Sequence, residues 1–172
     1  METIERVRIK VVSDLQMMQR VATWRLLSKK IVFTNGCFDL LHLGHVDYLS
    51  KAADAGDVLI VAVNTDNSVR KLKGEHRPIN NEEQRTMLLA SLSFVDAVVL
   101  FDQPTPYEMI QMVQPDVLVK GADYKPEEIV GYDIVIGRGG LVKTIDILQG
   151  YSTSLIEQRI IQHQEAGIKS QD

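Results

Sequence analysis

Two histidines three residues apart are the side chains in this sequence best suited to chemistry. His42 and His45 enclose Leu43 and Gly44 and stand at the expected start of a helix. Imidazole N–H groups there can donate to an anion, and a helix N-terminus adds free backbone N–H groups and a partial positive charge. Because Gly44 has no Cβ, a phosphate can approach the backbone closely. The pattern predicts a phosphate site.

The same histidines could instead bind zinc or be ordinary surface residues. Zinc is disfavoured because the pair lacks a glutamate at the zincin spacing and a third ligand nearby. The single cysteine, Cys37, excludes a cysteine-built zinc site and a disulfide framework. Taken alone, the histidines would be surface residues as readily as functional ones. Their place after a strand and the Asn35-Gly36 turn favours the anion site.

Small, polar and charged residues follow four predicted strands. They occupy positions 35–39, 64–66, 120–124 and 149–154. In an open parallel sheet the loops after the strands converge, and ligands bind there. Taken one at a time, residues 120–121 could form a solvated turn, residues 152–154 a helix cap, and Lys71 and Lys73 a solvated charge run. Their meeting at one edge of the sheet favours a site, because a cap and a phosphate cradle can use the same N–H groups.

The elements that must position these residues alternate between strands and helices. Short apolar and β-branched runs predict strands at 30–34, 58–63, 97–101, 117–120 and 141–145. Helical spacing and end signals predict helices at 13–28, 44–55, 80–92, 105–114 and 152–162. We expect Asn80 with Glu83, and Thr105 with Pro106, to begin the third and fourth of these helices. The alternation predicts an α/β fold, a Rossmann-like doubly wound parallel sheet of about five strands with helices on both faces.

Length and composition exclude several classes of protein. The 172 residues, 45% of them hydrophobic, suffice for one domain with a buried core. The net charge of −4 argues against a nucleic-acid partner. No segment approaches the roughly 18 apolar residues of a membrane span, and residues 1–10 do not form a signal peptide. We therefore expect a cytoplasmic protein with no membrane or nucleic-acid partner.

Two stretches resemble the signatures of the HxGH nucleotidyltransferases, the cytidylyltransferase-like superfamily. Residues 34–39 followed by 42–45 resemble its opening signature, and residues 150–154 its second, in which a Ser-Thr-rich turn opens the last helix. A narrower resemblance, to the adenylyltransferase domain that joins AMP to heptose 1-phosphate, lies in residues 72–74, 77–80, 83–85 and 119–128. The product of that domain is ADP-heptose, the lipopolysaccharide core precursor. The arginine that begins the second signature of glycerol- and choline-phosphate cytidylyltransferases is absent here, in agreement with the heptose enzymes.

The resemblance implies a reaction, substrates and partners. A sugar-phosphate oxygen would attack the α-phosphorus of ATP and expel pyrophosphate, with Mg²⁺ bound to the ATP. The resemblance also implies a homo-oligomer, an N-terminal helical extension at 1–28, a nucleotidyltransferase domain at 29–165 and a disordered tail at 166–172. Because heptose adenylyltransferases are often fused to a sugar kinase, we expect a separate kinase here. The alternatives are transfer of CMP or AMP to another phosphorylated alcohol, such as glycerol 3-phosphate, and a nucleotide-binding module without turnover.

Residue roles follow from the same resemblance. We expect His45 to donate to the α-phosphate and His42 to the β- or γ-phosphate, with Lys73 and Lys120 neutralising charge. No residue is assigned as a metal ligand, although Asp39 or Asp123 could orient the ion or its waters. The expected nucleotide-binding residues are Thr34, Asn35, Gly36, Cys37, Phe38, Asp39, Gly44, Asn64, Asp66, Arg85, Gly121, Asp123, Tyr124, Gly150, Tyr151, Ser152 and Thr153.

Overall fold

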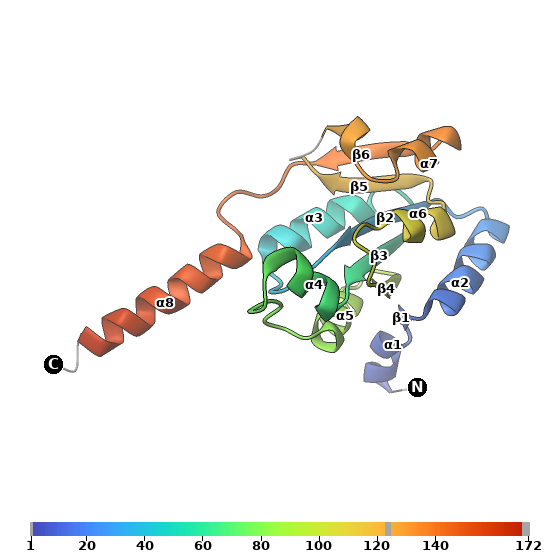
Figure 1. Ribbon diagram of the computed structural model, residues 1–172. Helices are drawn as coiled ribbons and strands as arrows, with labels where there is room; N and C mark the ends of the chain where they lie inside the picture. The colour runs from blue at the N-terminus through green and yellow to red at the C-terminus, as the bar shows by residue number, and fades with distance from the viewer. Residues whose placement is uncertain (1, 123–124, 170–172) are drawn as a thin grey trace.

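The computed structural model describes residues 2–122 and 125–169. Its centre is a parallel sheet of six strands in the order β1-β4-β3-β2-β5-β6 (Figure 1). The predicted doubly wound α/β fold is confirmed, and the sheet has one strand more than the five expected. The strands are β1 (Val11–Val12), β2 (Ile31–Gly36), β3 (Val58–Asn64), β4 (Ala97–Phe101), β5 (Val117–Gly121) and β6 (Leu141–Ile145).

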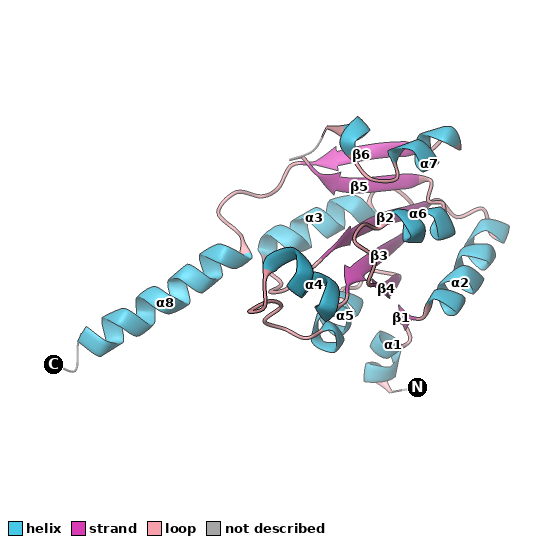
Figure 2. Cartoon of the chain, in the orientation of Figure 1, coloured by secondary structure: helices cyan, strands magenta, loops and turns pink. Residues whose placement is uncertain are grey.

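Helices cover both faces of this sheet (Figure 2). One core lies between the sheet and α2, α6 and α7, and includes Met17, Ile110 and Val135. The other lies under α3 and α5 and includes Leu49 and Leu89. The helices are α1 (Thr3–Arg8), α2 (Asp14–Leu26), α3 (Leu43–Ala53), α4 (Asp66–Lys73), α5 (Glu82–Ser91), α6 (Tyr107–Val113), the 3₁₀ turn η1 (Pro126–Glu128), α7 (Tyr132–Gly137) and α8 (Thr153–Lys169).

Strand β3 shows why the central strands read as continuous apolar runs. All of its residues are buried. Ile60 and Ala62 enter the core under α2 and α6, whereas Leu59 and Val61 enter the core under α3 and α5. Successive side chains of a strand point to opposite faces, so a strand covered on both sides must be apolar at every position.

The N-terminal residues belong to the sheet as well as to helices. β1 pairs in parallel with β4, with Val11 opposite Val98. α2 begins at a capping box in which Ser13 and Gln16 satisfy each other's backbone N–H groups. The buried side chains of α2 include Met17 and Val21. Residues 11–26 of the expected helical extension thus complete one edge of the sheet and part of its core.

Several helix boundaries differ from the predictions. α5 is capped by Asn81 with Gln84 and not by Asn80 with Glu83, one residue later than expected. Pro106 occupies the cap position of α6, which has no side-chain cap, so the expected Thr105 cap is wrong. α8 continues past the predicted end near residue 162 to Lys169, and so includes residues 166–169 of the expected tail. Among the described residues, no helix is long and apolar enough to cross a membrane.

Candidate active site

The turn between β2 and α3 places both histidines at the carboxyl end of the sheet. After β2 ends, Phe38 adopts a left-handed backbone with a φ of 47° and buries its ring. α3 then begins after His42, whose side chain makes no capping hydrogen bond. The first backbone N–H groups of α3 therefore have no partner within the helix and are available to an anion.

Gly44 stands where a side chain would be crowded. A Cβ on this residue would lie 3.1 Å from the His42 ring and 3.3 Å from the Cβ of Tyr151. Both distances are shorter than ordinary van der Waals contacts. Glycine at this position therefore allows His42 and the loop before α8 to pack against the first turn of α3.

The two imidazoles form a stacked pair. Their ring centroids lie 3.8 Å apart with the planes 19° from parallel, and the edge of His45 meets Phe38 at 5.4 Å. Burial lowers the pKa of His42, and burial with a smaller contribution from His42 lowers the pKa of His45 to about 4. Both rings are consequently neutral at pH 7. The Nδ1 atom of each ring is buried and has no hydrogen-bond partner in the described part of the chain.

A cavity of about 520 Å³ opens in front of this pair. Its walls come from the ends of β2, β3 and β5, from α3 and from the start of α8. These are the strand ends at which the sequence predicts a ligand site. The described residues that line it are Asn35, Gly36, Cys37, Phe38, Asp39, His42, Gly44, His45, Tyr48, Asn64, Lys73, Lys120, Gly121, Ile147, Tyr151, Ser152, Thr153 and Ser154.

Two lysines reach this cavity from different elements. Lys120 is the penultimate residue of β5, and its Nζ donates to the Asn35 carbonyl at 3.3 Å. Burial, only partly offset by the charge of Cys37, lowers the pKa of Lys120 to about 8. Lys73 is exposed and ends α4. The pair can place positive charge near an anionic ligand, and the buried Lys120 is the more sensitive of the two to what binds beside it.

Ser152 begins α8 at the edge of the cavity. Its Oγ accepts a hydrogen bond from the Leu155 N–H at 3.1 Å, as expected of a helix cap. Tyr151 and Thr153 line the cavity beside it. The start of α8 therefore faces the start of α3 across the cavity, so that two helix N-termini meet there.

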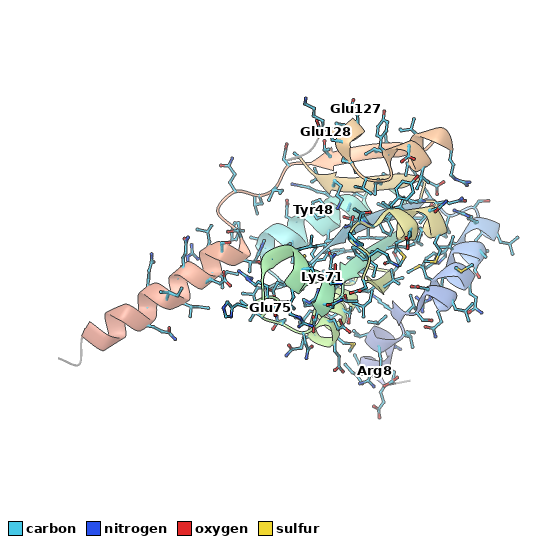
Figure 3. All side chains as sticks on the ribbon, viewed as in Figure 1. Arg8, Tyr48, Lys71, Glu75, Glu127 and Glu128 are labelled. Atoms are coloured by element: carbon cyan, nitrogen blue, oxygen red, sulfur yellow. The ribbon has the colours of Figure 1, made fainter. Side chains whose placement is uncertain are left out.

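Thr34 and Tyr48 tie three elements together behind the histidines. The Thr34 hydroxyl donates to Tyr48 Oη at 2.7 Å, and Tyr48 Oη donates to the Val119 carbonyl at 3.1 Å. Burial raises the pKa of Tyr48 to about 12, so the phenol stays neutral. Tyr48 projects from α3 (Figure 3) and lines the cavity, a position that sequence reasoning missed. Its spacing of three residues from His45 was the available signal, because such residues share a helix face.

Arg85 is fully buried and is not among the residues that line the cavity. Its guanidinium donates to the carbonyls of Cys37 and Asn64, each at 2.7 Å, and to that of Asn80 at 3.1 Å. It also pairs with the Asp66 carboxylate at 2.7 Å. In the structure Arg85 and Asp66 thus join the ends of β2 and β3 to the start of α5.

Asp39 holds the loop at residues 77–80 against the histidine turn. Its carboxylate accepts from the Ile79 and Asn80 N–H groups, at 2.8 and 3.0 Å, and from Arg77 at 2.8 Å. Arg77 also pairs with Glu157 on α8. Burial alone would raise the pKa of Asp39, but these hydrogen bonds outweigh burial and hold the pKa below its usual value. Asp39 thus connects the histidine turn, the loop and α8.

The residues around the cavity fit a magnesium ion that arrives on a nucleotide. Among the described residues, no group of three or more histidine, cysteine or acidic side chains could hold a metal ion. Asp39 contributes the one carboxylate that lines the cavity in this part of the chain, and both of its oxygens already accept hydrogen bonds. Mg²⁺ usually keeps several waters and binds through substrate phosphates with one or two carboxylates. In this structure the Asp39 carboxylate is thus engaged with residues 77–80 of the protein itself.

Most of the predicted site residues therefore meet at one cavity. Thr34, Asp66 and Arg85 lie behind it, and Gly150 lies beside it without lining it. Asp123 and Tyr124 lie outside the described residues. Tyr48 and Ile147 were missed, and no local pattern distinguishes Ile147 from other apolar residues of the loop before α8.

Comparison with known proteins finds a matching family model and similar sequences. Residues 33–159 match the family model described as cytidylyltransferase-like. The chain is 55% identical over 143 residues to the bifunctional protein HldE of Wolinella succinogenes, an alignment covering 83% of this chain and 29% of that protein. It is 49% identical over 158 residues to the HldE protein of Koribacter versatilis, covering 91% and 32%. The chain spans less than a third of the length of these relatives.

Solved structures show the same similarity. The lipopolysaccharide core biosynthesis protein from Thermoplasma volcanium is 31% identical, with a TM-score of 0.58 over 72% of this chain and 99% of that one. Pantoate-beta-alanine ligase from Francisella tularensis has a TM-score of 0.58 over 81% of this chain and 67% of that one, at 16% identity. The second similarity is one of fold alone.

Proposed function

Because this chain belongs to the cytidylyltransferase-like family, we propose that it is a nucleotidyltransferase that transfers AMP from ATP to heptose 1-phosphate, giving ADP-heptose and pyrophosphate. The observation that carries the proposal is the pair of neutral imidazoles at the start of α3, whose Nδ1 atoms have no partner among the described residues. A buried polar atom without a partner costs free energy. Phosphate oxygens at this corner would accept hydrogen bonds from the rings and from the free N–H groups of the helix.

The choice of acceptor has separate support. Residues 72–74, 77–80, 83–85 and 119–128 resemble the heptose adenylyltransferase domain. The HldE relatives and the T. volcanium lipopolysaccharide protein point the same way. The missing arginine of the second signature disfavours the glycerol- and choline-phosphate cytidylyltransferases.

In the proposed reaction the protein supplies no nucleophile. An oxygen of the acceptor phosphate forms a bond to the α-phosphorus of ATP, and the bond from that phosphorus to the bridging oxygen breaks. Pyrophosphate leaves with the electron pair. The chain's task is to align the two substrates and to stabilise the negative charge that grows on the transferred and leaving phosphates.

Each group of the site has a role in that task. His45 donates to the α-phosphate, and His42 to the β- or γ-phosphate. Backbone N–H groups of residues 36–38 and 152–153 complete the cradle, and Lys73 and Lys120 neutralise charge. Mg²⁺, bound with the ATP, would shield the triphosphate when it is present. Asp39 and Arg85 act indirectly, by holding the loops that shape the cavity.

The proposal extends to the surroundings of the enzyme. ATP and a sugar 1-phosphate are metabolites of the cytoplasm, where we place the protein, and a sugar kinase activity would supply the acceptor. We also propose that the chain forms a homo-oligomer. Its support is a stripe of exposed apolar residues on α2, described here as the α2 stripe: Leu15, Met18, Ala22 and Leu26.

A substrate panel tests the proposed reaction. Purified protein would be mixed with Mg²⁺, ATP or CTP, and heptose 1-phosphate, other sugar 1-phosphates or glycerol 3-phosphate, and pyrophosphate would be measured. We expect release with ATP and heptose 1-phosphate. Turnover with CTP and glycerol 3-phosphate alone would instead indicate a glycerol-phosphate cytidylyltransferase. ATP binding without release from any pair would indicate a module that binds nucleotide only.

A further inference from the structure

A second cavity lies beside the candidate active site, and the Lys120 side chain lines both. This smaller cavity has a volume of about 210 Å³. Its other walls are residues 104–106, in the loop between β4 and α6, and residues 128–130, at the end of η1. A partly buried cation that lines two cavities can contact a ligand in either one.

Strand alternation places the second cavity on one particular face of the sheet. Leu118 on β5 and Phe33 on β2 belong to the core under α2 and α6. Lys120 and Asn35 stand two residues further along the same strands, so they point to that same face. The histidines come from α3, which packs on the opposite face. The proposed reaction site therefore spans the edge of the sheet, with the imidazoles on one side and Lys120 with Asn35 on the other.

The geometry of phosphoryl transfer distinguishes these two sides. The attacking and leaving oxygens lie roughly in line through the phosphorus. With His42 and the start of α3 holding the leaving β- and γ-phosphates, and His45 the α-phosphate, the acceptor must approach the phosphorus from the side of Lys120. The second cavity opens on that side.

Two polar groups on this face of the sheet fit a ligand with several hydroxyl groups, one at each cavity. Asn35 lines the first cavity, and its Oδ1 atom is buried without a hydrogen-bond partner in the described part of the chain, so it requires a donor. Glu128 lines the cavity, and its carboxylate meets Lys125 only at 3.9 Å. Carboxylate and amide oxygens accept from sugar hydroxyls, while Ile129 and Val130 offer an apolar surface.

We propose that the second cavity binds the sugar of the acceptor, with Lys120 contacting the acceptor phosphate between the two cavities. This inference rests on the proposed function and adds to it a location for the acceptor. It assigns Glu128 to recognition of sugar hydroxyls and residues 104–106 to the wall of this cavity, with Asn35 facing the acceptor from the first cavity.

Kinetics with Glu128→Gln test the proposal, because this change removes the carboxylate and keeps the size of the side chain. Glu127→Gln is the matched control, since Glu127 neighbours Glu128 on η1 (Figure 3) but does not line the cavity. We expect Glu128→Gln to raise KM for the sugar 1-phosphate about tenfold, the effect of losing a hydrogen bond to a charged group, and to leave KM for ATP unchanged. Glu127→Gln should match the wild type in both.

A second variant fills the cavity. Thr105→Trp should raise KM for the sugar 1-phosphate more than Glu128→Gln does. KM for ATP should again stay unchanged, and this unchanged value would also show that the site is folded. The assignment of the cavity is overturned if Glu128→Gln leaves KM for the sugar 1-phosphate unchanged, or raises both KM values equally. In either case, turnover by the wild-type protein still supports the proposed function. Failure of the wild-type protein to release pyrophosphate with every sugar 1-phosphate contradicts the proposed function and this inference together.

Discussion

At the residue scale, the histidine pair shows how burial prepares a group for an anion. Stacking at 3.8 Å is compatible with two neutral rings, whereas two imidazolium ions at this distance would repel each other. A neutral ring can still donate through one nitrogen. A bound triphosphate would favour the charged form, so we expect the pKa of His45 to rise on binding from its value of about 4.

His45→Ala removes one of the proposed phosphate donors. We expect kcat to fall roughly 100- to 1000-fold, as when one oxyanion donor is lost, with the circular dichroism spectrum unchanged. His163→Ala is the control, because His163 is an exposed histidine on α8. A rate for His45→Ala near that of the control would show that the assigned role is wrong.

We expect deprotonation of Lys120 to lower the activity of the proposed enzyme at alkaline pH. In the free protein its pKa is about 8, so it is charged below that pH and increasingly neutral above it. Because a phosphate prefers the charged form, kcat/KM should fall as the pH rises through about 8. In Lys120→Arg the guanidinium stays charged, and the fall should disappear whatever the variant's absolute activity. A pH profile of kcat/KM with the same alkaline fall in both proteins would assign it to another group.

At the element scale, the cavity depends on connections among loops that are far apart in sequence. Arg85 joins the ends of β2 and β3 to the start of α5. Asp39 joins the histidine turn to residues 77–80 and, through Arg77, to α8. α8 projects from the body of the protein (Figure 1), and the ion pair of Arg77 with Glu157 connects it to the loop at residues 77–80. The helix N-termini can serve a ligand only while these connections hold them together.

Asp39→Asn tests this connection through stability. Because the folded-state pKa of Asp39 is lowered, its contribution is fully present above its unfolded pKa, near 4, and is lost as the pH falls through the lower folded value. We expect the variant to lose roughly 1.5–3 kcal/mol of unfolding free energy at neutral pH. Urea unfolding at neutral pH and near pH 3 should show this difference shrinking at the acid end. Asp54→Asn, at the exposed end of α3, is the control, and a pH-independent difference would contradict the account.

At the scale of the whole molecule, the N-terminal segment presents an uncovered apolar surface. α2 buries Met17 and Val21 against the sheet but leaves Leu15 66% and Leu26 85% exposed on its outer side. Contiguous apolar surface of this kind marks an interaction site more often than isolated exposed leucines do. In an antiparallel pair of α2 helices, Asp14 at one end would lie near Arg25 of the second copy, so the surface suits a two-fold interface.

Charges in the α2 stripe should therefore dissociate the oligomer. We expect Leu15→Glu combined with Leu26→Glu to elute as a monomer where the wild type elutes as a dimer or larger species, with the fold retained. Leu88→Glu is the control, because Leu88 is 44% exposed on α5, away from the stripe. Size-exclusion chromatography with light scattering measures the masses. A wild-type monomer, or an oligomer that survives the double substitution, would exclude this interface.

Much of this architecture follows from local sequence. Apolar runs predicted β3 and β4 because a strand buried on both faces needs an apolar residue at every position. The parallel order then predicted that the residues after the strands would meet, so His42, His45 and Lys120 could be singled out as neighbours. β1 escaped prediction because two residues are too few to show a period, and its pairing with β4 depends on contacts distant in sequence.

Side-chain direction was beyond the reach of such reasoning. Arg85 and Asp66 have the residue types of a phosphate site, yet in the folded chain they satisfy one another and nearby carbonyls. Tyr48 looks like a core residue and instead lines the cavity. Residue type and spacing are local properties, whereas the partner of a charged or aromatic group is set by what long-range packing brings beside it. The sequence therefore specified the kind of chemistry and the edge of the sheet, and packing selected which side chains face the ligand and which hold the loops in place.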